Sequence, residues 1–206
     1  MYPLTLSANL DGWRLFKARR KHSEFQKIAQ KVFIRDKYKC QYCGFRDLVH
    51  QEVANINGNY RQNELSNLAT CCALCIECNF LGVLGRENRV IFFPQMSQAE
   101  LMHVVRVLFC LIASKTVYVE TAKSLYRNLR QLMQPVDELF GKDASISDLF
   151  GQSLLDTQNM GKDAQKKAML PLRLLPNQQH FTEQIAHWST LILPKLEASD
   201  TDMDDF

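Results

Sequence analysis

The sequence lacks the features of a membrane-spanning or exported protein. Its longest apolar run, Val104 to Ala113, is interrupted by Arg106 and is far shorter than the roughly 20 residues that a membrane-spanning helix requires. No leader with a basic start and an apolar centre opens the chain, so no Sec signal is expected. We therefore expect a soluble protein on the reducing side of a membrane.

Internal repeats are also absent, as are the glycine-rich phosphate-binding loop and the nucleophile elbow. The composition is that of a globular chain, because 46% of the 206 residues are hydrophobic and 23% are charged. A chain of this length buries about 70% of the surface that it exposes when unfolded. It is therefore expected to fold by itself, as one domain or as a domain with an appended element.

Charge is unevenly distributed, although the net charge is only +3. From Asp11 to Arg46 there are eleven Lys or Arg and three acids, whereas Glu197 to Phe206 holds five acids and no base. The basic head is typical of a surface for nucleic acid, an acidic protein or a membrane face, or is simply the solvated face of a helix. The acidic tail is typical of a disordered terminus and argues against a chain that binds nucleic acid throughout.

Hydrophobic periodicity predicts a mostly helical chain around an irregular centre. Helical spacing of apolar residues and end signals predict these elements: a helix over 23–36 with Ser23 as N-cap, a strand over 89–93 stopped by Pro94, a helix opened by a Ser97–Glu100 capping box, helices over 117–133, 147–156 and 182–193, and a connection over 158–179. Between residues 39 and 88 the periodicity is lost and glycines punctuate a cysteine-rich stretch. This pattern is typical of a small module held together by a metal ion.

Six of the seven cysteines lie in that stretch, and their spacing predicts a zinc site. Cys40 and Cys43 form one C-x-x-C pair, and the glycine at position 44 permits the tight turn that two ligands to one cation require. A second pair follows after 28 residues. Two such pairs in a chain without an export signal favour one tetrahedral Zn²⁺ over a disulfide framework or a redox dithiol. A site of four thiolates is closed, so this zinc is expected to be structural and not catalytic.

The spacing leaves the second pair open. Cys72 with Cys75 and Cys75 with Cys78 are both C-x-x-C pairs. Cys71 is expected to point away from its neighbour and to be no ligand. Cys110 stands alone in an apolar stretch and is expected to be a core thiol.

The cysteine-rich stretch resembles the HNH-type, treble-clef nuclease module over about fifty residues. The resemblance rests on residues 34–44, on Glu52-Val53-Ala54-Asn55-Ile56-Asn57-Gly58-Asn59 and on residues 67–75. It favours Cys72 and Cys75 as the second pair of zinc ligands. In the family, the strand after the first C-x-x-C pair carries a histidine that is the general base and a neighbour that helps to hold the catalytic metal. Here Ala54 and Asn55 stand at those two positions. Neither side chain accepts a proton from water near neutral pH, so the sequence has the HNH-like module without its catalytic base.

The other histidines do not replace that base in the sequence. His50 lies five residues before Asn55, an odd offset that places the two side chains on opposite faces of a strand. The remaining four are expected to be solvated or capping residues, and they are His22, His103, His180 and His187.

Over its whole length the chain resembles the DotN (IcmJ) family, components of the Dot/Icm type IVB secretion system. The resemblance rests on the basic head, on the degenerate HNH signature around Ala54 and Asn55, and on a helical body of similar length. It implies a non-enzymatic subunit of the coupling complex at the cytoplasmic face of the bacterial inner membrane. It also implies that the subunit binds the C-terminal extension of the coupling ATPase DotL and helps to recruit effector proteins.

Together these observations predict an α+β protein. A basic helix and an HNH-like zinc module, a β-hairpin plus helix, would occupy residues 1–94, a helical region 95–196, and a disordered acidic tail 197–206. The predicted zinc ligands are Cys40, Cys43, Cys72 and Cys75. The predicted function is a non-enzymatic adaptor that binds protein partners. A metal-dependent nuclease or a DNA-binding module is the alternative.

Overall fold

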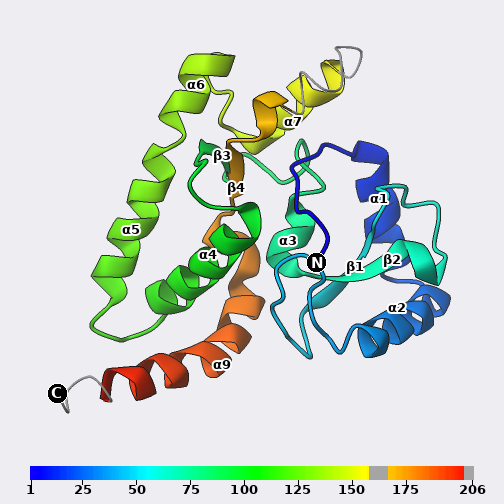
Figure 1. The fold of residues 1–206 in the computed structure, drawn as a ribbon, viewed down its shortest axis with the longest axis horizontal. Coiled ribbons are helices and arrows are strands. Elements are labelled where there is room, and N and C mark those ends of the chain that lie inside the picture. The colour runs from blue at the N-terminus through cyan, green and yellow to red at the C-terminus, as the bar shows by residue number, and fades with distance from the viewer. Residues whose placement is uncertain (158–166, 202–206) are drawn as a thin grey trace.

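The computed structural model of the chain describes residues 1–157 and 167–201. Its elements form two regions that lie side by side (Figure 1). The first, which we call the cysteine module, comprises residues 1–88 and contains α1 (Leu10–Arg19), α2 (Ser23–Arg35), β1 (Gln51–Asn55), η1 (Leu65–Asn67), β2 (Leu68–Cys72) and α3 (Ala73–Glu77). The second, which we call the helical body, comprises residues 89–201 and contains β3 (Arg89–Phe92), α4 (Gln98–Ala113), α5 (Val119–Gln131), α6 (Gln134–Phe140), α7 (Ser147–Asp156), β4 (Leu172–Leu175), η2 (Gln178–Phe181) and α9 (Thr182–Thr201). The α+β class expected from the sequence is confirmed.

The cysteine module is built on one antiparallel pair of strands. Gln51 of β1 lies opposite Cys72 of β2, and Asn55 lies opposite Leu68. Helix α2 packs on this pair through Val32, which is buried in a small cluster with residues of both strands. The sheet and α2 therefore form a base from which the chain enters α3 directly after β2.

Helix α2 differs slightly from its expected form at both ends. Ser23 is its first helical residue, and His22 is the N-cap without a side-chain hydrogen bond, so the expected capping role of Ser23 is wrong. The helix ends at Arg35, and the Asp36 carboxylate accepts a 2.8 Å hydrogen bond from the backbone N–H of Thr70. This bond fixes the end of α2 against β2.

The helical body opens with the strand that the sequence predicted, β3, but the partner of that strand was missed. β4 pairs with it in antiparallel fashion, with Arg89 opposite Leu175 and Phe92 opposite Leu172. The four residues of β4 lie in the stretch that was expected to be a connection, because so short an apolar run carries no periodicity. Residues 158–166 of that connection lie outside the described residues.

The helices of the body mostly follow their sequence signals. The Ser97 hydroxyl caps the backbone N–H of Glu100, whose carboxylate accepts from the backbone N–H of Ser97, as the capping box predicted. Helix α7 has its expected bounds. Helix α5 ends at Gln131, and the separate helix α6 begins at Gln134 with Pro135 in its first turn.

Helix α9 is longer than the sequence signals indicate. It contains Pro194 and continues to Thr201, and so overlaps the segment expected to be a disordered tail from residue 197. Residues 202–206 of that tail lie outside the described residues.

The two regions share one hydrophobic core. Trp188 of α9 is fully buried and packs edge-on against Phe45 of the cysteine module at a ring distance of 6.0 Å. On the other side of the core the backbone of α7 presses against the chain after α3, where a Cβ on Gly151 would lie 2.2 Å from the backbone nitrogen of Gly82. The body therefore holds the module from α7 and from α9.

Candidate metal centre

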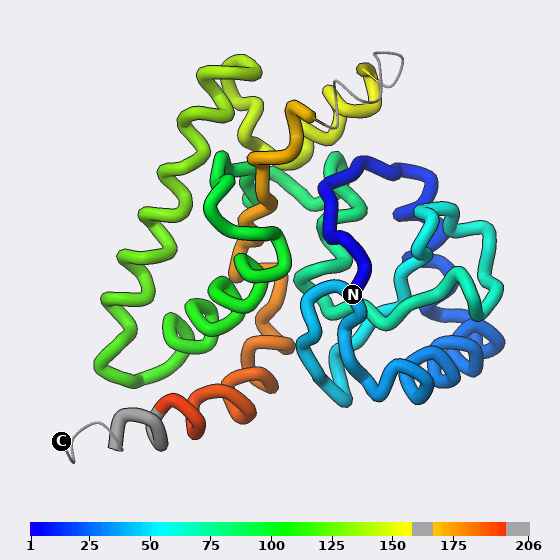
Figure 2. Tube along the Cα trace, viewed as in Figure 1, coloured from blue at the N-terminus to red at the C-terminus, as the bar shows by residue number. Residues whose placement is uncertain are grey.

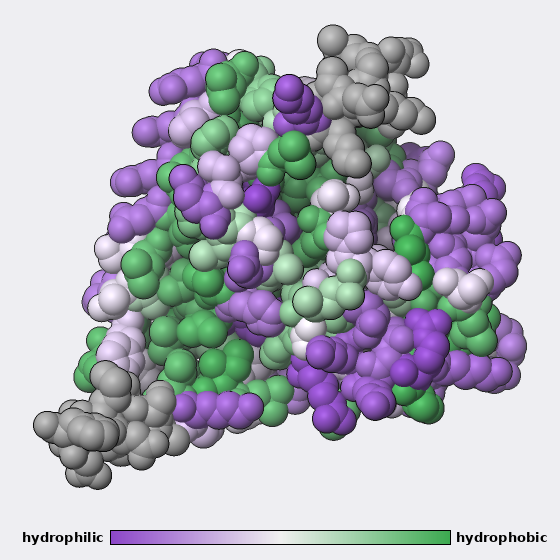
Figure 3. Space-filling view, in the orientation of Figure 1, coloured by the Kyte–Doolittle hydropathy of each residue, from purple (hydrophilic) through white to green (hydrophobic). Residues whose placement is uncertain are grey.

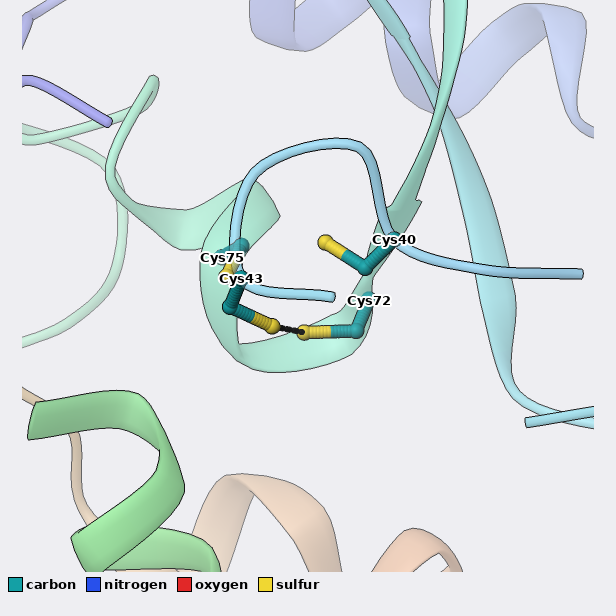
Figure 4. Close-up of side chains that lie close together, drawn as sticks. All are labelled: Cys40, Cys43, Cys72 and Cys75. Carbon is teal, nitrogen blue, oxygen red and sulfur yellow. Dashed lines mark hydrogen bonds between the residues drawn. The ribbon is translucent and has the colours of Figure 1, made fainter. Parts of the chain in front are cut away.

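Four cysteines gather in one buried cluster at the centre of the cysteine module (Figure 4). Their sulfur atoms all lie within 4.8 Å of one another, and no other group of three or more His, Cys, Asp or Glu among the described residues is as compact. Cys40 and Cys43 come from the loop before β1, Cys72 ends β2, and Cys75 lies in α3. These four are the residues that the sequence analysis selected.

The first pair is positioned by a tight turn. The backbone N–H of Gly44 donates to the carbonyl of Cys40 at 2.9 Å, and the N–H of Cys40 donates to the carbonyl of Phe45 at 2.9 Å. Gly44 has a φ of 82°, a left-handed conformation that glycine adopts without a steric penalty. The turn brings both sulfurs to the same side of the loop.

The second pair is set by the junction of β2 and α3. Cys71 and Cys72 are neighbours on β2, so their side chains point to opposite faces of the strand, and only Cys72 enters the cluster. Cys75 follows one helical turn later. Cys78, the C-cap residue of α3, is equally buried but lies outside the cluster. The geometry therefore brings Cys72 and Cys75, and not Cys75 and Cys78, to the first pair.

The distance between the Cys43 and Cys72 sulfurs fits a tetrahedral metal ion. Zinc–sulfur bonds of 2.3 Å in a tetrahedron place the sulfurs about 3.8 Å apart. The Cys43 and Cys72 sulfurs are separated by 3.7 Å. A donor set of four thiols suits zinc among the common metal ions of proteins.

A buried arginine lies beside the cluster. Arg106 of α4 is 1% exposed, and its guanidinium donates a hydrogen bond to the Cys72 sulfur at 3.2 Å. The same guanidinium stacks 3.7 Å from the ring centre of Phe45. Burial lowers the pKa of Arg106, but the negative charges of Cys72, Cys43 and Cys75 outweigh that effect and raise it. A permanently charged group in so dry a place requires a counter-charge, and ionised thiols supply it.

The cysteines themselves do not ionise together without a cation. Hydrogen bonds from Cys43, Cys71 and Cys72 lower the pKa of Cys40, whereas burial raises the pKa of Cys72 well above its ordinary value. The hydrogen bond from Cys40 raises the pKa of Cys43, but those from Cys72 and Cys75 outweigh it and lower that pKa. The cluster therefore favours ionisation of the first cysteine pair and resists ionisation of the second. A bound divalent cation would stabilise four thiolates, and Arg106 would then offset part of their excess negative charge.

His103 of α4 holds the first cysteine pair from outside. Its Nε2–H donates to the carbonyl oxygen of Cys43 at 2.7 Å, which leaves Nδ1 as the acceptor of a 3.4 Å bond from Arg106. The sequence analysis assigned this histidine to solvent or a cap. Arg106 was visible as a charge inside an apolar run, but its neighbours were not.

The positions where the HNH module carries its base are occupied by structural residues. Ala54 is fully buried, and the Asn55 amide donates to the backbone carbonyls of Asn59 and Gln62. The Asn55 oxygen accepts from the buried guanidinium of Arg19. Asn55 therefore closes the loop after β1 and joins it to α1.

Two other histidines have acidic partners that no sequence spacing indicated. The His180 Nδ1 lies 3.3 Å from Glu77, and the His187 Nε2 lies 3.1 Å from Asp47. Each pair joins the helical body to the cysteine module across more than 100 positions of the chain. His50 lies outside the cysteine cluster, and its ring contacts that of His187 at 5.3 Å.

Fold and site together define an α+β protein with a buried cluster of four cysteines that could hold a metal ion. No protein-family model matches the chain. The chain is similar to "Type 4 apparatus protein DotN" of Legionella pneumophila (strain Philadelphia 1), with 36% identity over 197 residues that cover 94% of this chain and 92% of the relative. Identity at this level over nearly the full length of both chains shows common descent. The chain belongs to the DotN family, which confirms the resemblance found in its sequence.

Proposed function

We propose that the protein is a non-enzymatic adaptor subunit of a Dot/Icm type IVB secretion system. In this proposal one structural zinc ion, held by Cys40, Cys43, Cys72 and Cys75, fixes the cysteine module, and the helical body presents a surface to protein partners. The observation that carries the proposal is the closed state of the cysteine cluster. All four thiols are buried, the most exposed being Cys43 at 6%.

A closed cluster favours a structural zinc over a catalytic one. A catalytic zinc keeps one position for water or substrate, whereas four thiolates fill the tetrahedron. The aromatic ring of Phe45 and the guanidinium of Arg106 pack against each other beside the cluster. Zinc binding at such a site contributes to folding free energy, because the unfolded chain does not hold the ligands together.

Strand β1, which follows the first cysteine pair, also favours a non-enzymatic role. Cleavage of a phosphodiester by an HNH module needs a base that activates water. Ala54 has no titratable group, and the Asn55 side chain is fully engaged by backbone carbonyls and Arg19. A nuclease reading would need a base from elsewhere in the chain.

The proposed partner is the C-terminal extension of the coupling ATPase DotL, together with other subunits of the coupling complex. The helical body offers a suitable surface between α4 and α5, where hydrophobic side chains gather on the face shown in Figure 3. A hollow of about 320 Å³ there is lined by Val104, Leu108, Leu125, Asn128, Leu129 and Leu132. Leu125 is 50% exposed, although it is a large apolar side chain. Such a hollow fits the apolar side chains of a helix or an extended segment.

We further propose that the protein works at the cytoplasmic face of the bacterial inner membrane. Among the described residues, no helix has the length and apolar character needed to cross a bilayer. Attachment to the membrane would then be indirect, through the partner ATPase.

The experiment that tests this function is co-purification of the full chain with the C-terminal extension of DotL, followed by calorimetric titration. We expect a stoichiometric complex that survives high salt, because an apolar hollow is insensitive to screening. Leu125→Asp is expected to weaken binding, whereas Leu139→Asp on α6, 66% exposed but outside the hollow, is expected to leave it unchanged. Absence of binding at every salt concentration would contradict the proposal.

The nuclease alternative is tested on the same purified protein. With Mg²⁺ or Mn²⁺ added, we expect supercoiled plasmid to stay intact. Nicking that His50→Ala abolishes would restore the nuclease function and contradict a purely non-enzymatic role.

A further inference from the structure

The loop that follows Cys40 and Cys43 meets helix α9 at a cluster of polar side chains. Asp47 of this loop is 2% exposed, and its carboxylate accepts hydrogen bonds from Trp188 Nε1 at 2.9 Å and from His187 Nε2 at 3.1 Å. The ring of His50 lies 5.3 Å from that of His187 in an edge-to-face arrangement. Neither histidine contributes to the cysteine cluster or to the proposed partner surface.

The carboxylate of Asp47 fixes which nitrogen of His187 is free. The Asp47 oxygen that faces His187 also accepts a 2.8 Å hydrogen bond from the Val49 backbone N–H, so this oxygen acts as an acceptor. His187 must therefore donate through Nε2, and its Nδ1 carries the lone pair in the neutral ring. A histidine oriented by a carboxylate on one nitrogen is the arrangement in which protein histidines bind metal ions through the other.

A second imidazole contacts the ring of His187, and a carboxylate lines the same cavity as that second imidazole. His50 lines a cavity of about 270 Å³ whose wall also includes Glu183. Glu183 is exposed and lies one turn before His187 on α9, so the two side chains share one face of the helix. Glu52 lines the same cavity but is engaged by Arg20 at 2.7 Å, which leaves Glu183 as the available carboxylate.

We propose that His50, His187 and Glu183 form a second metal site, distinct from the cysteine cluster, for a divalent transition metal ion. Two imidazoles and one carboxylate are a donor set for zinc, nickel or cobalt and discriminate against magnesium and calcium, which prefer oxygen ligands alone. The exposed Glu183 side chain reaches the ion by rotating, while Asp47 holds the ring of His187 as a positioning residue. The ion would bridge the cysteine module and α9.

The test uses the full chain with zinc in its cysteine cluster, dialysed against Ni²⁺ and then analysed for nickel and zinc per chain. We expect one nickel ion per chain with no loss of zinc. His50→Ala and His187→Ala are each expected to lower the nickel affinity by at least about tenfold. His180→Ala is the matched control, because that histidine also pairs with an acid at the module–body junction but its ring contacts that of Phe181 instead of a histidine.

A further variant keeps the test independent of folding. Glu183→Gln changes only an exposed side chain, and it is expected to lower nickel affinity while leaving zinc content and thermal unfolding unchanged. Binding of no nickel, displacement of zinc by nickel, or equal nickel affinity in the wild type and all three variants would each overturn the proposal. A Co²⁺ spectrum without thiolate charge-transfer bands would support an imidazole and carboxylate site.

Discussion

The cysteine module and the helical body are stabilised in different ways. The module concentrates six buried cysteines between residues 40 and 78, and four of them form a cluster that fits one metal ion. The body instead distributes its stability over helix packing and one short sheet, with Leu101, Phe109 and Trp188 fully buried. With the proposed metal ion bound, loss of a single ligand would threaten the whole module, whereas loss of a single contact in the body removes only its own share of the stability.

The junction between the two regions combines apolar and polar contacts. It is apolar at Gly82 and Gly151, but polar where Arg106 reaches Cys72 and where Asp47 reaches α9. Buried polar contacts of this kind favour one relative placement, because any other leaves a charge without its partner. The cysteine cluster is thus coupled to the body through α4.

Removal of a cysteine ligand is expected to have the largest effect. Cys40→Ser should release zinc and unfold the cysteine module, because structural zinc sites contribute about 10 kcal/mol or more of apparent binding free energy. The measurement is zinc per chain together with the thermal unfolding midpoint. Cys78→Ala is the matched control, since Cys78 is as buried as Cys40 but lies outside the cluster, and it should keep its zinc. Unchanged zinc and midpoint in Cys40→Ser would remove the distinction between the two regions.

Replacement of the buried arginine is expected to have the next largest effect. Arg106→Met should destabilise the protein by about 3–5 kcal/mol and weaken zinc retention, because the thiolate charge loses its buried cation. Urea unfolding and competition with a chelator measure the two consequences. Arg127→Met, on the exposed face of α5, should change stability by less than about 0.5 kcal/mol. Equal zinc retention by Arg106→Met and the wild type would mean that the body does not support the metal centre.

A methyl group at the other contact between the regions should cost less. Gly151→Ala forces a Cβ to within 2.2 Å of the Gly82 nitrogen, so we expect a loss of about 1–3 kcal/mol as α7 shifts. Zinc content should stay at the wild-type value, because the cluster lies elsewhere in the module. Gln152→Ala, at the exposed neighbouring position, serves as control. Release of zinc by Gly151→Ala would show that the module depends on α7 for its metal site.

The smallest expected effect lies at the start of α4. Ser97→Ala removes the hydroxyl that caps Glu100 and should cost about 1 kcal/mol, or roughly 3 °C in the unfolding midpoint of a chain of this size. Ser97→Thr keeps the acceptor and should lose much less. A midpoint drop in Ser97→Ala as large as that of Gly151→Ala would indicate that α4 depends on its cap more than on packing.

The accuracy of the sequence-based predictions follows the range of the interactions involved. The capping box of Ser97 and the bounds of α7 depend on neighbouring residues and were correct. The capping role of Ser23 was wrong because the preceding residue, His22, ends the non-helical chain, and serine is also tolerated at the first helical position. β4 was missed because its partner β3 lies some eighty positions away and no local pattern indicates the pairing.

At the candidate metal centre, too, local features were predicted and contacts between residues distant in the chain were not. The spacing of the cysteine pairs indicated Cys40, Cys43 and Cys75, which the structure brings together with Cys72, and Cys71 was expected to point away from its neighbour. The choice of Cys75 with Cys72 over Cys78 came from the resemblance and not from spacing. The Cys43 carbonyl that accepts from His103 and the acidic partners of His180 and His187 were not foreseen, because each lies more than fifty positions away in the chain.

By itself, the sequence determined the class of the protein, its family, the helices with clear end signals and the cysteines with the spacing of metal ligands. These features depend on local geometry or on similarity that is written directly in the chain. Only the tertiary structure decided that Arg106 lies against Cys72, that Asp47 orients His187, and that β4 completes the sheet of the body. Those contacts join residues distant in the chain, and they exist because one core buries side chains from both regions together.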